Sequence, residues 1–221
     1  MEKPGTAALN LEQILEAGLE DWRKLAQALH ARFTTGSFTA GLDFVTAVTE
    51  AAERANHHPD VTLTYPLVDV KLVSHDVGAV TQRDVDLARE ISGIARDKRI
   101  DSDPAAPTQL ELALDTADAG RIGPFWAALL TGDAGAFDGG EVRDKSQRVP
   151  NLWFQDTDTH DTPRQRFHID LWVPHDVAEG RIAAAVAAGG QVVDDSEKPS
   201  FVVLADPDGN KACVCTILDR G

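Results

Sequence analysis

Three histidines and a carboxylate lie close together in the sequence between Glu53 and His75. The stretch NHHPDVTLTYPLVDVKLVSHD, residues 56–76, contains His57, His58 and His75, although the chain holds only 7 histidines in all. Histidine has an ordinary pKa close to neutral pH, so it can both donate and accept a proton in one reaction. The stretch therefore indicates general acid/base chemistry if the fold gathers the imidazoles.

Glu53 precedes His57 by four residues in a segment whose pattern predicts a helix. Side chains at this spacing are neighbours on a helix surface. We therefore expect the Glu53 carboxylate to hold the His57 imidazole and to favour its charged form. The negative end of the helix dipole acts in the same direction, because His57 is placed in the last turn. These effects suit His57 to the role of a general acid.

His58 is expected to point elsewhere, because Pro59 forces the residue before it into extended backbone. His75 closes a predicted strand and, by alternation, lies opposite the apolar face of residues 68–72. The returning hairpin would then bring three imidazoles to one pocket. Two alternatives stay open, namely surface histidines without a role and a metal site. The metal site is disfavoured, since adjacent histidines at a helix end diverge.

The first half of the chain must supply the elements that position these side chains. Its apolar spacing predicts a helix over 11–19, a hairpin over 21–35, a helix over 37–56, a hairpin over 61–75 and a helix over 81–98. Thr81 and Asp84 fit the N-cap and acidic N3 positions of the last helix. This order predicts an α+β layer, an antiparallel sheet with helices on one face.

One apolar stripe is predicted for the helix over 37–56, at a spacing of 3.6 residues. It consists of Leu42, Val45, Val48, Ala52 and Ala55. In the following hairpin, the apolar parity changes at Pro66, which predicts a tight turn there.

The second half of the chain repeats a pattern of strand, helix and further strands. A polar stretch with two prolines, residues 99–107, is the expected linker between domains at 8–98 and 108–221. Strands are expected over 108–118, 151–157, 166–173, 191–195, 201–206 and 211–218, and helices over 119–132 and 176–190. Two similar halves in succession imply a duplicated module.

Composition excludes several classes of function. The formal net charge is −15 and the pI is about 4.7, so the surface repels phosphate backbones and nucleic-acid binding is disfavoured. No apolar run reaches the 18 residues of a membrane span, and the first residues show no secretory signal pattern. A cytoplasmic location is the expectation.

The spacing of the chemically active residues resembles that of pterin-4a-carbinolamine dehydratases, without a gap. The matching run is Glu53, three residues, His57-His58-Pro59, five residues, Tyr65, nine residues, His75, eight residues and Asp84. The segments DFVTAVTEAAERANHHPDV, LVSHD and TQRDVDLA are similar to family segments as well, so the resemblance covers about residues 8–98.

The resemblance implies an α+β fold, frequent dimers or tetramers, and loss of water from a 4a-hydroxytetrahydropterin to give a quinonoid dihydropterin. Carried over by position, His57 and His75 would form the acid/base pair, His58 would bind the pterin, and Glu53 would support the histidines.

Asp60 and Ser74 would flank the same pocket and contact the pterin ring. Asp84 belongs to the family pattern, although the residues themselves indicate a helix cap. The reaction needs no metal and no cofactor, since a proton donor at the departing hydroxyl and a base for the ring N–H are enough.

The second half resembles glyoxalase-like members of the vicinal-oxygen-chelate superfamily, which implies paired βαβββ units around a cupped sheet. His168 matches a common metal-ligand position and Glu111 fits the one on the first strand. The last strand usually supplies a glutamate, where this chain has Lys211, Ala212 and Cys213. A lysine repels a metal ion, so a metal-dependent enzyme is not expected here.

Three functions therefore compete. The leading hypothesis is a pterin carbinolamine dehydratase with an accessory glyoxalase-like domain. The second is a non-catalytic protein that binds a small molecule or promotes dimerisation. The third is metal-dependent lyase or oxygenase chemistry in the second half.

Overall fold

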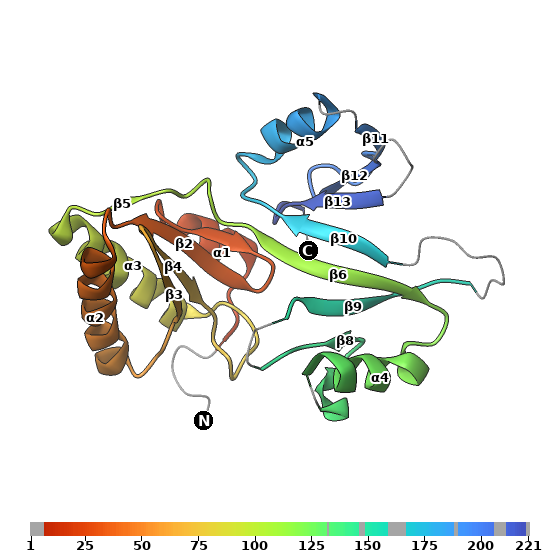
Figure 1. Ribbon diagram of the computed structural model, residues 1–221, viewed down its shortest axis with the longest axis horizontal. Coiled ribbons are helices and arrows are strands. Elements are labelled where there is room, and N and C mark those ends of the chain that lie inside the picture. The colour runs from red at the N-terminus through yellow and green to blue at the C-terminus, as the bar shows by residue number, and fades with distance from the viewer. Residues whose placement is uncertain are drawn as a thin grey trace. The chain divides into compact units, whose positions relative to one another are not determined.

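The structure is a computed structural model that describes residues 7–131, 133–145, 149–158, 167–187, 190–205 and 211–219. The chain divides into two units, Met1–Pro107 and Thr108–Gly221. Each unit has its own sheet, as Figure 1 shows. No helix among the described residues combines the length and apolar character needed to cross a membrane.

The first unit is an antiparallel sheet with helices packed on one face (Figure 1). Its elements are α1 (Leu11–Glu16), β1 (Arg23–Leu25), β2 (Ala28–Thr34), α2 (Phe38–Ala55), β3 (Asp60–Thr64), β4 (Leu67–Leu72), α3 (Gln82–Lys98) and β5 (Asp101–Ser102). The strand order is β1-β2-β4-β3, and β5 pairs with β2 as well. The predicted order of helices and hairpins is confirmed. The short strand β5 falls where the sequence indicated linker.

Alternation along β2 and β4 creates the core of the first unit. Every second residue of these strands is almost fully buried: Leu29, Ala31, Phe33, Val68, Val70 and Leu72. They pack against apolar side chains of α2 and α3 in one cluster. The Phe33 ring lies 5.0 Å from that of Phe44 and 6.2 Å from that of Trp22, measured between centroids. Burial of this face fixes the register of the sheet.

The buried face of α2 agrees with the predicted stripe at Val48 and Ala52 and differs from it at its two ends. Leu42 is 52 % exposed and Ala55 is exposed, whereas Phe44 and Ala51 lie in the core. The helix approaches the sheet at Gly41, where an added Cβ would lie 2.5 Å from Leu63 Cδ1. A pattern that counts only apolar side chains overlooks a glycine contact, so the two ends of the predicted stripe are wrong while its middle is confirmed.

The sheet face away from the helices carries charged residues in cross-strand pairs. Arg32 of β2 and Asp69 of β4 are register partners, joined by two hydrogen bonds of 2.6 and 2.8 Å. His30 and Lys71 are the register partners two residues along. Burial lowers the pKa of His30 to about 3, with help from the positive charges of Lys71 and Lys24 and against the negative charge of Asp69.

We expect His30 to make the stability of the first unit depend on pH. The unfolded chain binds a proton at His30 below about pH 6.5, whereas the folded chain does so only near pH 3, so stability falls with decreasing pH between these values. The free energy of unfolding of His30→Gln, measured in urea at several pH values, should lack this component, which has a slope of up to about 1.4 kcal/mol per pH unit. If the free energy of unfolding changes with pH in the same way in wild type and in His30→Gln, the proposed contribution of His30 is contradicted.

The second unit is a mixed sheet built from two equivalent halves. The first half contains β6 (Gln109–Thr116), α4 (Ala119–Thr131), a 3-10 turn (Ala134–Ala136), β7 (Phe137–Asp138), β8 (Glu141–Val142) and β9 (Asn151–Asp156). The second half contains β10 (Phe167–Trp172), α5 (Ala178–Ala187), β11 (Gln191–Asp194), β12 (Phe201–Ala205) and β13 (Lys211–Cys215). The short strands β7 and β8 were not anticipated from the sequence.

The pairing of strands confirms the duplicated module. β6 runs parallel to β9, and β10 runs parallel to β13, while the remaining strands of each half pair antiparallel. The antiparallel pair of β6 and β10 joins the halves into the order β11-β12-β13-β10-β6-β9-β8-β7. Each half has its own apolar cluster, to which its own helix contributes.

Candidate active site

The site begins where α2 ends. Asn56 adopts the left-handed conformation, with φ 47° and ψ 42°. The Asn56 amide donates to the Glu53 carbonyl and the His57 amide donates to the Ala52 carbonyl, at 3.2 and 3.1 Å. This is the hydrogen-bond pattern of a Schellman cap, for which asparagine is one of the favoured residues. The chain reverses its direction here, so His57 lies beyond the helix and not in its last turn.

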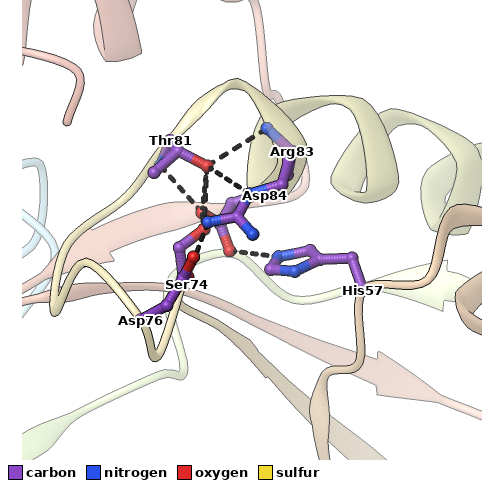
Figure 2. Close-up of polar contacts among 6 residues, drawn as sticks. All are labelled: His57, Ser74, Asp76, Thr81, Arg83 and Asp84. Carbon is purple, nitrogen blue, oxygen red and sulfur yellow. Dashed lines mark hydrogen bonds and ion pairs between the residues drawn. The ribbon is translucent and has the colours of Figure 1, made fainter. Parts of the chain in front are cut away.

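The reversal brings His57 to the first turn of α3. His57 Nε2 lies 2.7 Å from Asp84 Oδ1, and the two side chains are 7 % and 0 % exposed. Figure 2 shows the imidazole pointing at the carboxylate, which comes from a helix 27 residues further along the chain. The pair joins the end of α2 to the start of α3.

Asp84 is fully buried and its second oxygen is also occupied. Asp84 Oδ2 accepts hydrogen bonds from the Ser74 hydroxyl and the Thr81 amide, both at 2.7 Å, and from the Thr81 hydroxyl at 3.2 Å (Figure 2). We refer to His57, Ser74, Thr81 and Asp84 as the Asp84 network. The predicted capping box of Thr81 and Asp84 is confirmed, and the same carboxylate also serves the histidine.

The network determines which nitrogen of His57 can transfer a proton. A carboxylate only accepts hydrogen bonds, so the nitrogen that faces it, Nε2, must carry a proton. The other nitrogen, Nδ1, is then the one that gains or loses a proton. The arrangement holds the imidazole in one orientation, which is what acid/base chemistry would require of it.

Glu53 does not hold His57, contrary to the expectation from the spacing of four residues. The Glu53 carboxylate instead lies 3.2 Å from His58 Nε2, and the side chains of Glu53 and His58 are both exposed. The reason is the left-handed Asn56, which ends the helical geometry before His57 and turns the next side chain toward Glu53 instead. An exposed pair of this kind contributes little to stability.

His75 lies in a turn directly after Ser74, and its side chain is exposed. Arg83 anchors the turn from outside, since its Nη2 lies 2.6 Å from Asp76 Oδ1. The Arg83 hydrogen bond lowers the pKa of Asp76, and the charge of His57 contributes in the same direction. Within the described chain no hydrogen bond or ion pair joins His57 to His58 or His75. The gathering of all three histidines around one ligand stays a prediction.

Asp60 and Ser74, the expected flanking residues, have different surroundings. Ser74 is fully buried with its hydroxyl bonded to protein partners, so that hydroxyl is occupied. Asp60 begins β3, and its buried Oδ2 atom has no hydrogen-bond partner among the residues that the structure describes. Val61 packs on the core, so alternation directs Asp60 to the face away from the helices. Its unsatisfied oxygen can accept a hydrogen bond from a ligand.

Comparison with known proteins assigns both halves to families. Residues 7–94 match the family model of pterin 4 alpha carbinolamine dehydratase, and residues 111–215 match that of a glyoxalase-like domain. A protein of Thermosynechococcus vestitus is 40 % identical over 79 residues, which are 36 % of this chain and 83 % of that protein. A protein of Nocardia farcinica is 41 % identical over 93 residues, which are 41 % of this chain and 98 % of that protein. Both bear the name "Putative pterin-4-alpha-carbinolamine dehydratase".

The chain belongs to the pterin 4 alpha carbinolamine dehydratase family. A solved structure that is similar to part of this chain is a transcriptional coactivator/pterin dehydratase from Brucella melitensis. It is 30 % identical, covers 40 % of this chain and 99 % of its own, and has a TM-score of 0.39. In this chain the dehydratase domain, residues 7–94, is followed by a glyoxalase-like domain.

In the glyoxalase-like domain, Glu111 is buried and bonded to protein groups. Its Oε2 accepts a hydrogen bond of 2.9 Å from Trp172 Nε1, and Asn151 Nδ2 lies 3.4 Å from its Oε1. Asp170, its register partner on β10, accepts one of 3.0 Å from Trp153 Nε1. The side chain of His168 lies outside the described residues. Among those described, no three potential metal ligands gather.

Replacing Asp84 should lower the stability of the dehydratase domain more than replacing any exposed acidic residue of α3. Asp84→Asn leaves buried donors of His57, Ser74 and Thr81 without a charged acceptor, so we expect a loss of about 2–4 kcal/mol in the free energy of unfolding. Asp86→Asn, on the exposed side of the same helical turn, is the matched control and should change stability by less than about 0.5 kcal/mol. Equal losses in urea unfolding would contradict the role of the network.

Glu111 is expected to stabilise the second unit through the hydrogen bond that it accepts from the Trp172 indole. Glu111→Ala leaves Trp172 Nε1 without this acceptor, which should cost about 1–3 kcal/mol, whereas Glu179→Ala on α5 should cost little. Thermal unfolding with and without EDTA separates this role from metal binding, because removal of a bound metal lowers the melting temperature. We expect EDTA to leave the wild-type transition unchanged, and a decrease would support the metal alternative.

Proposed function

We propose that the dehydratase domain removes water from a 4a-hydroxytetrahydropterin to give a quinonoid dihydropterin. The observation that carries the proposal is the buried pair of His57 and Asp84, which orients an imidazole for proton transfer. Membership of the family and the full set of Glu53, His57, His58 and His75 support it. A scaffold protein has no need of an oriented acid/base histidine.

His57 is the proposed acid and His75 the proposed base. The C4a–O bond breaks as the proton on His57 Nδ1 passes to the departing hydroxyl, which leaves as water. His75 takes the proton of the ring N–H, and the electron pair of that bond forms the new C=N double bond. Proton exchange with solvent restores both histidines, so no oxidant, metal or cofactor takes part.

The remaining site residues are proposed to bind the pterin. His58, held by Glu53, would contact the ring from the exposed side of the site. The unsatisfied oxygen of Asp60 would accept a hydrogen bond from an N–H group of the ligand, because pterins carry several such donors. The glyoxalase-like domain is an accessory part in this proposal, and a dimer or tetramer in the cytoplasm is its expected form.

The decisive experiment compares rates of dehydration of freshly generated 4a-hydroxytetrahydropterin. Wild type should exceed the spontaneous rate, and His57→Ala and His75→Ala should each reduce kcat/KM by about 10²- to 10⁴-fold, the usual contribution of a positioned acid or base. His175→Ala, in the other domain, is the matched histidine control and should retain full activity.

If dehydration proceeds at the spontaneous rate with wild type, His57→Ala and His75→Ala alike, the enzymatic proposal is overturned. If the wild type then still binds a tetrahydropterin in calorimetry, the non-catalytic binding alternative is favoured. Light scattering on the same samples measures the oligomeric state.

A further inference from the structure

Ser74 occupies a position that the proposed reaction does not itself explain. It is 0 % exposed, and its hydroxyl lies 2.7 Å from Asp84 Oδ2 and 2.8 Å from Thr81 Oγ1. Its backbone builds the turn that follows β4. The Ser74 amide donates to the Ala79 carbonyl at 3.1 Å, and the Ser74 carbonyl accepts from the amides of Val77 and Gly78 at 2.9 and 2.8 Å.

The two sets of contacts lead to the two proposed proton-transfer residues. Through its hydroxyl, Ser74 bonds the carboxylate that orients His57. Through its backbone, it forms the turn that carries the next residue, His75. Apart from His57 itself, no described residue both bonds Asp84 directly and lies next to a proposed site histidine in the chain.

We propose that Ser74 is a positioning residue that fixes the His75 turn to the carboxylate that orients His57. The proposal rests on the proposed function for the roles of the two histidines, and it gives Ser74 a role other than contact with the ligand. A rigid connection of this kind sets the distance between an acid and a base, which must both reach one substrate.

The protons of the network are consistent with this role. A hydroxyl has one proton, and a charged acceptor forms the stronger bond, so Ser74 donates to Asp84. The Thr81 hydroxyl then shares its single proton between the Ser74 oxygen and Asp84 Oδ2, at 2.8 and 3.2 Å. Thr81 Oγ1 accepts from the amide and the Nε–H of Arg83, at 3.2 and 3.4 Å. Every hydroxyl proton has an acceptor, and both oxygens of the Asp84 carboxylate accept hydrogen bonds, Oδ1 from His57 and Oδ2 from the other donors.

A second contact holds the same turn from the solvent side. The ion pair of Asp76 and Arg83 joins the turn to the first residues of α3, but Asp76 is largely exposed. An exposed ion pair is screened by water and contributes less than a buried hydrogen bond to a carboxylate. The buried bond of Ser74 is therefore the contact that should determine the geometry.

The test reads the histidine rings directly, in the full chain and without substrate. Nitrogen-15 NMR distinguishes the two neutral tautomers of an imidazole. In wild type we expect His57 to be protonated at Nε2. In Ser74→Ala the fraction protonated at Nδ1 should rise about threefold or more, and the ring signals of His75 should shift, because one bond of the network is lost.

Ser92→Ala is the matched control, since Ser92 is a buried serine of α3 whose hydroxyl accepts from Trp22 Nε1 at 3.0 Å, within another part of the core. It should leave both histidines unchanged. Should Ser74→Ala fail to fold, Ser74→Cys decides, because a thiol has similar volume but is a weak donor. Wild-type signals for both histidines in a folded Ser74 variant would overturn the proposal.

Kinetics supply an independent measurement. With 4a-hydroxytetrahydropterin as substrate, Ser74→Ala should lower kcat about tenfold, the equivalent of one net hydrogen bond, with a smaller change in KM. A rise in KM alone would show that Ser74 contacts the ligand, and would overturn the positioning role. Should wild type show no dehydratase activity, the proposed function fails, while the NMR comparison still decides the role of Ser74.

Discussion

A buried carboxylate is stable only if its environment replaces the hydration that it loses. Asp84 meets this condition with hydrogen bonds from an imidazole, two hydroxyls and a backbone amide. These donors come from the end of α2, from the turn after β4 and from the start of α3. The first unit can bury this charge only when the three segments are in place together. Its architecture and its candidate chemistry thus depend on one charged group.

Much of the first unit follows from the sequence, because its signals are local. The helix-hairpin order follows from apolar spacing, and the cap of α3 from Thr81 and Asp84 three residues apart. The contact of Asp84 with His57 spans 27 residues, and no local pattern encodes it. The partner of Glu53 does have a local signal, since an asparagine at a helix end favours a left-handed residue that redirects the chain. The resemblance pointed to Ser74 as a ligand contact, but no local pattern indicates its bond to Asp84, because a serine before a turn is common.

The glyoxalase-like domain shows the same division between local and distant information. The order of its long strands and helices follows from alternation and length. The facing carboxylates of Glu111 and Asp170 result from the antiparallel pairing of β6 and β10, whose register depends on the whole sheet. Each carboxylate accepts a hydrogen bond from an indole, so the tryptophans combine apolar packing with a polar contact. Residue types alone do not reveal this combination.

The capping box of α3 has a consequence for how the molecule responds to heat. Helix ends open more readily than helix centres, and such local opening costs less free energy than complete unfolding. Because the capping carboxylate is also the partner of His57, each opening of that end would release the imidazole while the hydrophobic interior remains intact. Catalytic competence would then fade on warming ahead of the cooperative melting transition.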